Sequence, residues 1–193
     1  GTASAQALSV LVAPLLARLY APDAYGTTTL FISLASIISV IACLRYELAI
    51  MLPRRDEIAA NLLVLSLCLV LITAGLSMAL ILPTQNLIIR LLNAPDLETF
   101  LPLVPLFVLV HAGFRSLIYW SSRTKRFGYL SIAQLAQSVI KNGAQLGCGL
   151  FGTAGANGLI TGAILGPTAG SLMLGAQTWR DGRSLFRHQI KWR

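Results

Sequence analysis

The sequence contains few charged side chains, and acidic ones are especially scarce. Only 11% of its 193 residues are charged, with 15 Lys and Arg against seven Asp and Glu. An ordinary soluble domain carries about 25% charged residues. Residues 24–44, 58–89 and 142–179 contain no Asp, Glu, Lys or Arg. Such runs argue against a soluble globular domain and favour helices that cross a membrane, which need about 20 apolar residues each.

Cysteine is scarce as well, with Cys43, Cys68 and Cys148 each in or beside an apolar run. No two of them have the spacing of metal ligands, and an odd number does not build a disulfide framework. We interpret all three as small buried hydrophobic residues. The sequence also lacks a nucleotide-binding loop. We therefore expect no metal and no other cofactor.

Apolar residues make up 55% of the chain. Their runs predict an all-α polytopic membrane protein, a bundle of about six transmembrane helices in a single membrane domain over residues 1–193. The predicted crossings are Thr2–Leu19, Thr27–Cys43, Ile58–Leu82, Phe100–Trp120, Tyr129–Leu150 and Gly158–Trp179.

The basic residues are distributed very unevenly between the two sets of loops. Eleven follow the second crossing, the fourth crossing or the sixth: Arg45, Arg54, Arg55, Arg123, Lys125, Arg126, Arg180, Arg183, Arg187, Lys191 and Arg193. The other set holds Arg18 and Arg90 only. Short loops rich in Lys and Arg stay in the cytoplasm, so the prediction places both termini there. The net charge of +8 is then a topology signal, and we expect no nucleic-acid partner because the chain offers no basic soluble surface.

Proline and glycine patterns suggest how the helices are joined and packed. Ala-Pro-Asp occurs at residues 21–23 and 94–96, where it predicts that one helix stops and the next begins. In the sixth crossing, small residues recur every four positions: Ala154, Gly158, Gly162, Gly166 and Gly170. This spacing predicts close packing against another helix, although a surface on which helices slide or bend during transport would look the same. Pro167 should kink or loosen this helix.

A polar face with an isolated lysine runs along the fifth predicted crossing. Gln134, Gln137, Ser138, Lys141 and Gln145 fall within an arc of about 100°, with Asn142 at its edge. Lys141 lies near the middle of the span, where an ionised side chain costs at least about 2.5–3.5 kcal/mol unless it faces water or a partner. The face therefore predicts a hydrated cavity. The alternative is a lysine paired with a carbonyl or carboxylate of a missing segment.

Two further groups of polar residues lie in or near the predicted crossings. His111 and Arg115 are four residues apart and share a helix face. A lone histidine is more often a packing residue than a proton carrier, and Arg115 is close enough to the helix end to reach the interface. From physical chemistry alone, Arg45 and Glu47 form an anchor at the membrane boundary, with Tyr46 as its interfacial aromatic.

Two motifs in the first 60 residues carry a family resemblance. "RLYAPDAYG" contains Arg18, Tyr20, Pro22, Asp23, Tyr25 and Gly26, and "RYELAIMLP" contains Arg45, Tyr46, Glu47, Ala49, Ile50, Leu52 and Pro53. They resemble the R-x-Y-x-P-[DE]-x-[YF]-G and R-Y-E-x-A-I-x-L-P segments of the bacterial polysaccharide transporter family, which includes the O-antigen flippases of the multidrug/oligosaccharidyl-lipid/polysaccharide exporter superfamily. Members of that family have twelve to fourteen helices in two lobes around a central cavity, so we expect this chain to be one lobe of a longer protein.

The resemblance implies a membrane transporter and not an enzyme. It implies movement of an oligosaccharide on undecaprenyl diphosphate across the bacterial inner membrane, for O-antigen, capsule or exopolysaccharide synthesis. The implied partners are this lipid-linked oligosaccharide, membrane lipids and other polysaccharide assembly proteins. The expected substrate-binding residues are Lys141, Arg45, Arg18, Gln134, Gln137, Asn142 and Gln145. In this assignment the lysine and arginines meet the diphosphate and the amides meet sugar hydroxyls.

Other classes remain open at this stage. A drug or cation antiporter of the same superfamily would need acids embedded in the membrane, whereas every Asp and Glu here lies in a loop or at a helix end. An intramembrane serine protease is disfavoured because no G-x-S-x-G opens a helix ahead of an intramembrane histidine. Only the polar face around Lys141 argues against a membrane scaffold that transports nothing.

Overall fold

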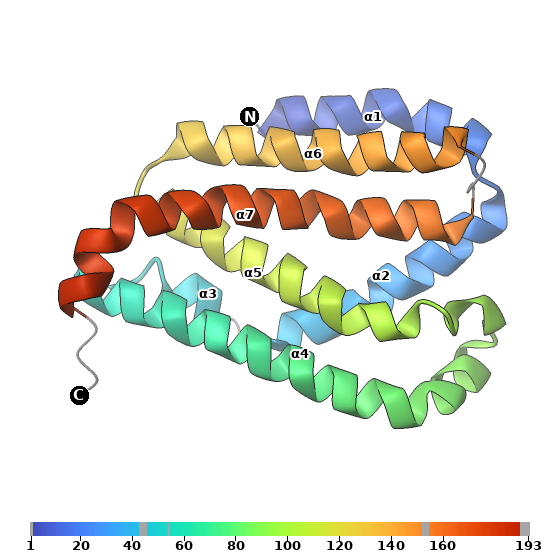
Figure 1. Ribbon diagram of the computed structural model, residues 1–193, viewed down its shortest axis with the longest axis horizontal. Helices are drawn as coiled ribbons and strands as arrows, with labels where there is room; N and C mark the ends of the chain where they lie inside the picture. The colour runs from blue at the N-terminus through green and yellow to red at the C-terminus, as the bar shows by residue number, and fades with distance from the viewer. Residues whose placement is uncertain (1, 43–45, 54, 152–154, 190–193) are drawn as a thin grey trace.

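The computed structural model describes residues 2–42, 46–53, 55–151 and 155–189; residues 2, 41, 57 and 181–189 are described by their backbone only. The described residues form an all-α bundle with no strand among them (Figure 1). Its elements in chain order are α1 (Thr2–Leu19), α2 (Pro22–Ala42), the short α3 (Tyr46–Ala49), α4 (Asp56–Leu92), the 3-10 turns η1 (Pro95–Leu97) and η2 (Leu101–Leu103), α5 (Val104–Arg123), α6 (Phe127–Leu150) and α7 (Ala156–Gln189).

The long helices pack in a consistent order. α6 lies between α1 and α7, α7 packs on α5, and α5 packs on α4, while α2 crosses α5 and also contacts α7 and α4 (Figure 1). The α2–α4 connection, the α5–α6 connection and the end of α7 lie at one end of the bundle, at the left of Figure 1. We call this the basic end, because Arg55, Arg123, Lys125 and Arg126 lie there. The other three connections, with Arg18 and Arg90, lie at the opposite end.

Each predicted crossing coincides with a long helix. Four of these helices are long and apolar enough to span a membrane: Pro22–Val40, Ile58–Leu92, Leu101–Arg123 and Ala156–Arg180. The first helix is apolar over the shorter stretch Ala3–Leu19, and the polar face of α6 keeps that helix out of the set. The all-α membrane bundle is confirmed, while the total of six crossings stays a prediction.

The helix ends differ from the prediction where hydrophobicity was a poor guide. α4 was expected to end at Leu82, yet it continues through Pro83 to Leu92. Pro83 cannot donate a backbone hydrogen bond, and the neighbouring Thr84 hydroxyl donates to the Leu80 carbonyl at 2.6 Å. α7 likewise runs ten residues past Trp179, to Gln189.

The proline turns begin new helices as predicted. Pro22 is the first residue of α2, five residues before the expected start at Thr27, and Pro95 is the first residue of η1. Before η1, Asn93 ends α4 in the left-handed conformation at φ 47°, which asparagine tolerates better than most residues. The segment between α4 and α5 forms two 3-10 turns, so α5 starts at Val104 instead of Phe100.

The small-residue ladder packs closely against neighbouring helices, as its spacing predicts. A Cβ added at Gly162 would lie 2.8 Å from the Lys141 carbonyl, and one at Gly166 would lie 2.8 Å from the Lys141 Cβ. At Gly170 it would meet the Phe114 ring of α5 at 2.5 Å. Ala154 is outside the described residues. α7 continues as one helix through Pro167, so the ladder keeps one face along the helix.

Candidate functional site

A cavity of about 580 Å³ lies among α1, α5 and α6. It is lined by Ala5, Gln6, Ser9 and Val10 of α1, by Phe114 and Ile118 of α5, and by Gln134, Gln137, Ser138 and Lys141 of α6. Ligand pockets commonly enclose roughly 300–1,000 Å³. The four lining residues of α6 are polar and those of α1 are half polar, whereas the wall from α5 is apolar and most of the exposed lining surface is apolar.

The cavity lies in the half of the bundle nearer the basic end. α1 and α6 run away from the basic end and α5 runs toward it (Figure 1). The lining residues come from the first part of α1, from the second half of α5, and from α6 up to its middle. Lys141 is the lining residue of α6 farthest along the helix from the basic end.

Lys141 sits on a section of backbone that the packing holds firmly. Its carbonyl faces Gly162 and its Cβ faces Gly166, at spacings that leave no room for a side chain on either glycine. Beyond Cβ, the side chain is partly exposed and lines the cavity. Within the described residues, no carboxylate lies in ion-pair range of its amino group. A cavity therefore lies beside Lys141, as the polar face predicts, and a partner from a missing segment stays the alternative interpretation.

Three predicted site residues meet in the cavity, namely Lys141, Gln134 and Gln137. Gln6 and Ser9 of α1 complete the polar wall, and the sequence interpretation missed both of them. Their signal was present in the sequence, since the uncharged polar side chains of the first helix fall in its first half, at residues 2–9. Nothing in the sequence, however, indicated that α1 would pack against α6.

Asn142 and Gln145 take a different position from the one expected. Both are buried, at 5% and 6% exposure. The Asn142 side-chain amide donates to the Ser9 and Ser138 hydroxyls at 3.2 and 3.3 Å. The Gln145 amide donates to the Leu159 carbonyl of α7 at 3.1 Å. These two amides join α6 to its neighbours and are not among the residues that line the cavity.

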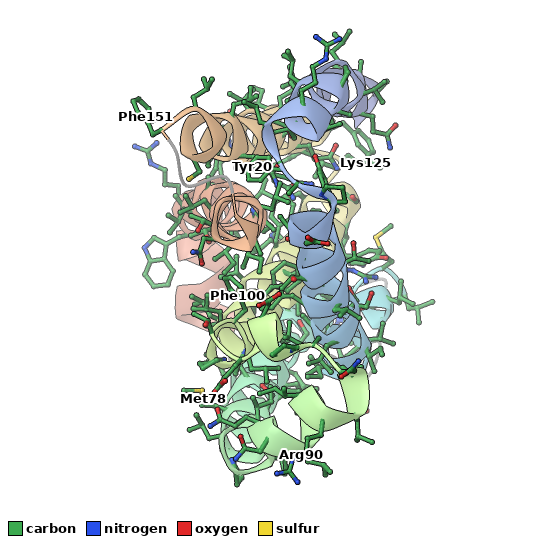
Figure 2. The ribbon with its side chains drawn as sticks, turned by 90° about the vertical axis from the view of Figure 1, so that its right-hand side faces the viewer. Tyr20, Met78, Arg90, Phe100, Lys125 and Phe151 are labelled. Atoms are coloured by element: carbon green, nitrogen blue, oxygen red, sulfur yellow. The ribbon has the colours of Figure 1, made fainter. Side chains whose placement is uncertain are left out.

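The first motif attaches the α1–α2 turn to α6 and α7. The Tyr20 hydroxyl donates to the Gln145 carbonyl at 2.6 Å, and its ring lies against Gly158 and Gly149. Figure 2, seen from this end of the bundle, shows Tyr20 close to α6 and α7. Burial raises the pKa of the Tyr20 phenol, so the hydroxyl keeps the proton that it donates.

The two predicted arginine sites are not part of this cavity. Arg18 is exposed near the end of α1, at the end of the bundle opposite to the basic end. Arg45 lies outside the described residues. Their proposed contacts with a diphosphate stay predictions.

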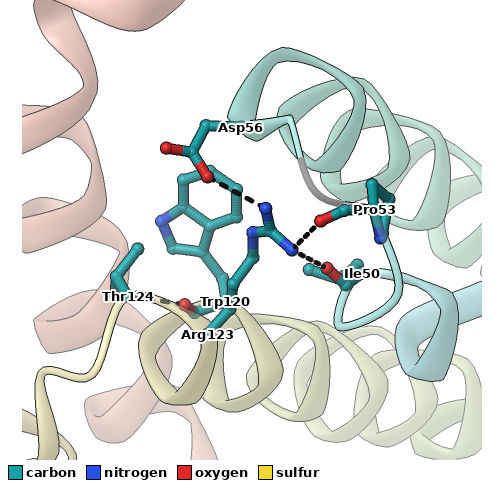
Figure 3. Close-up of polar contacts among 6 residues, drawn as sticks. All are labelled: Ile50, Pro53, Asp56, Trp120, Arg123 and Thr124. Atoms are coloured by element: carbon teal, nitrogen blue, oxygen red, sulfur yellow. Dashed lines mark hydrogen bonds and ion pairs between the residues drawn. The ribbon is translucent and has the colours of Figure 1, made fainter.

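The second motif is held by two arginines of α5. The Arg123 guanidinium donates to the Ile50 carbonyl at 3.2 Å, to the Pro53 carbonyl at 2.6 Å and to the Asp56 carboxylate at 2.9 Å (Figure 3). Arg115 forms an ion pair with Glu47, in which its Nη2 atom lies 3.6 Å from the carboxylate Oε1. Glu47 is buried, at 4% exposure. Sequence reasoning counted Arg123 only as a topology signal, because its partners lie about 70 residues away.

His111 takes a packing role on α5. Its ring stacks on Phe107, with centroids 5.2 Å apart and planes inclined by 13°. Phe107 in turn meets Phe31 of α2 edge to face, with centroids 5.6 Å apart. Across the described ranges, no group of three or more His, Cys, Asp and Glu residues could hold a metal ion.

Comparison with known proteins identifies the family. The family model described as polysaccharide biosynthesis protein matches residues 15–189. Comparisons with curated proteins and with solved structures gave no significant match. The matched region contains both motifs and the α5 and α6 walls of the cavity, and it confirms the family resemblance of the two motifs. With its long apolar helices, the chain is a multi-pass membrane protein that belongs to the polysaccharide biosynthesis protein family.

Proposed function

We propose that the protein is a flippase for an undecaprenyl-diphosphate-linked oligosaccharide in the bacterial inner membrane, and not an enzyme. Its product would supply the synthesis of O-antigen, capsule or exopolysaccharide, in concert with other assembly proteins. The observation that carries this proposal is the cavity in which Lys141 lies beside Gln6, Gln134 and Gln137, with no acidic residue among the side chains described as lining it.

The charge of the cavity suits the constant part of such a substrate. A diphosphate must pass the middle of the bilayer, where a charged group is costly. A cation in a polar cavity lowers this cost, and low-dielectric walls strengthen its attraction for an anion. Lys141 lines the cavity from near the middle of α6, where such a cation would be needed.

The neutral groups of the cavity suit the variable part of the substrate. Glutamine side chains offer both donors and acceptors, as sugar hydroxyls do. They contribute no charge that would hold one transport state too tightly. The apolar wall of Phe114 and Ile118 offers a surface for the carbon-bound hydrogens of a sugar ring. The mixture of amides, hydroxyls and one cation favours an anionic glycolipid over a purely apolar compound.

The orientation of the cavity fits loading from the cytoplasm. The basic end is the predicted cytoplasmic end, and the cavity lies in that half of the bundle. An anionic headgroup made in the cytoplasm would meet the basic end before it reaches Lys141.

A cation antiporter of the same superfamily is less well supported. Such a site needs an acidic residue in its cavity. The buried acid Glu47 lies at the basic end and faces Arg115, and it is not among the residues that line the cavity. No described feature favours the antiporter or the scaffold over the flippase.

Substitutions of Lys141 in cells that depend on this protein for surface polysaccharide test the proposal. Lys141→Gln is expected to reduce surface polysaccharide at unchanged protein abundance, and Lys141→Arg to retain more of it because the charge is kept. Lys141→Leu separates the proposal from a merely tolerated charge. If the leucine variant were abundant and fully active, the cavity would not act through this cation.

A further inference from the structure

Apolar side chains are exposed at the basic end of the bundle, in residues 46–52 between α2 and α4. Leu52 is 81% exposed and Met51 is 50% exposed, while Tyr46 and Leu48 are exposed by 41% and 40%. Exposed apolar residues on the long helices are explained by the hydrocarbon around a membrane span. Residues 46–52 belong to no spanning helix, so their exposed apolar surface needs another explanation.

The inner side of the same segment packs against α4 and α5. Ile50 is fully buried in a cluster with Ala59, Leu63 and Trp120, and Glu47 is 4% exposed beside Arg115. The segment thus turns Glu47 and Ile50 inward, while four large apolar side chains face outward: Tyr46, Leu48, Met51 and Leu52. A segment of this kind is suited to the boundary between headgroups and acyl chains.

The segment is fixed in place and not a loose loop. Arg123 donates to the carbonyls of Ile50 and Pro53 and to the Asp56 carboxylate (Figure 3). These contacts attach its end to the last turn of α5. The outward side chains are therefore presented in one orientation relative to the spanning helices.

The charges around the segment favour an anionic partner. Arg55 follows it in the sequence, and Lys125 lies two residues beyond Arg123; both are exposed. The acids whose side chains are described at this end, Glu47 and Asp56, already face Arg115 and Arg123. Their charges are balanced within the protein, so the exposed Arg55, three residues after the segment, and the exposed Lys125 leave this end of the bundle basic.

We propose that residues 46–52, together with Arg55 and Lys125, form an interfacial anchor that binds anionic lipids in one leaflet of the membrane. Met51 and Leu52 enter the acyl boundary, and the two cations contact lipid phosphates. The binding of a leaflet at this end requires no transport activity and is independent of the role of Lys141.

A nitroxide at position 52 tests this anchor. Leu52→Cys is labelled in the whole protein after its native cysteines are replaced by serine, and the protein is reconstituted in vesicles of phosphatidylcholine with or without phosphatidylglycerol. Accessibility to oxygen and to a water-soluble nickel complex then gives the depth of the label. We expect greater access for oxygen than for nickel, and a deeper position when phosphatidylglycerol is present.

Arg55 and Lys125 are tested with protein extracted from the same vesicles. Native mass spectrometry then measures which lipids stay bound to the protein. A cation near an anionic surface is worth about 1 kcal/mol, so Arg55→Gln and Lys125→Gln are each expected to lower the preference for phosphatidylglycerol by about fivefold. Arg90→Gln, at the opposite end, is the matched control and is expected to change the preference of this site little. Equal retention in all variants would overturn the proposal. The proposal would also be overturned if the nitroxide at position 52 were more accessible to nickel than to oxygen, or shielded by protein from both reagents. An equal depth of the label with and without phosphatidylglycerol would overturn it as well.

Discussion

At the scale of single residues, the polar face of α6 performs two different tasks. Gln134, Gln137 and Lys141 line the cavity, whereas Asn142 and Gln145 bond to α1 and α7. All of them lie within one arc of the helix, so residue type and spacing did not separate them. The distinction comes from which neighbour each side chain meets, and that depends on the packing of distant segments.

The two tasks predict opposite effects of substitution. Gln137→Ala is expected to lower transport while leaving thermal stability in detergent unchanged, because the side chain lines a cavity. Gln145→Ala is expected to lower stability by roughly 1–3 kcal/mol, because it leaves the buried Leu159 carbonyl without its side-chain donor. Thermal unfolding and a transport assay on the same preparations distinguish the effects. The reverse pattern would contradict our assignment of the two amides.

Arg123 offers a second prediction at this scale. Arg123→Ala removes three hydrogen bonds and leaves carbonyls of the turn before α4 unpaired, so we expect a loss of roughly 1–3 kcal/mol in unfolding free energy. Arg123→Lys is expected to recover only part of it, since one ammonium group lacks the planar fork of guanidinium. The exposed Lys125→Ala is the control and is expected to change thermal stability little. Equal stability of all three variants would show that the turn is held by other contacts.

At the scale of helices, the close approach of α6 and α7 depends on glycine at defined positions. Gly162→Ala and Gly166→Ala would each bring a Cβ to 3.0 Å or less from a backbone oxygen of α6. Overpacking of this kind costs about 1–3 kcal/mol. Because the Lys141 backbone is the surface that must move, we expect these variants to lose stability and transport together.

Glycines of α6 that face open space provide the matched control. Neither Gly143 nor Gly147 has an atom within 4 Å of an added Cβ. Alanine at an unobstructed helix position is favoured over glycine by roughly 0.5–1 kcal/mol. Gly143→Ala is therefore expected to leave the unfolding temperature equal or higher, opposite in sign to Gly162→Ala. Similar destabilisation by both would mean that the ladder on α7 has no special role in packing.

The helices themselves could be predicted from the sequence, whereas several of their ends could not. Apolar runs located every long helix, and Pro22 marked the start of α2. The third crossing was expected to end at Leu82, but α4 continues through Pro83 to Leu92, with the Thr84 hydroxyl bonded to the Leu80 carbonyl. The partners of Arg123 and the α1 wall of the cavity were not predictable, because both depend on contacts across about 70 residues or more.

At the scale of the whole molecule, the account makes a prediction about orientation. The connections with many cations and those with few lie at opposite ends of the bundle (Figure 1), and the basic end is expected to face the cytoplasm. In a background without native cysteines, Lys125→Cys is expected to react with an impermeant thiol reagent only from the cytoplasmic side. Glu98→Cys, exposed between η1 and α5, is expected to react only from outside. Labelling of both from one side would contradict the topology.

The most direct test of the central claim is the rate at which the protein moves a lipid-linked oligosaccharide between leaflets of proteoliposomes. The account predicts that the wild type moves it, that Lys141→Arg retains a substantial part of the rate, and that Lys141→Gln loses most of it while unfolding at a similar temperature. Rates for Lys141→Gln equal to the wild type, at equal protein incorporation, would show that the cavity does not carry the diphosphate through this lysine.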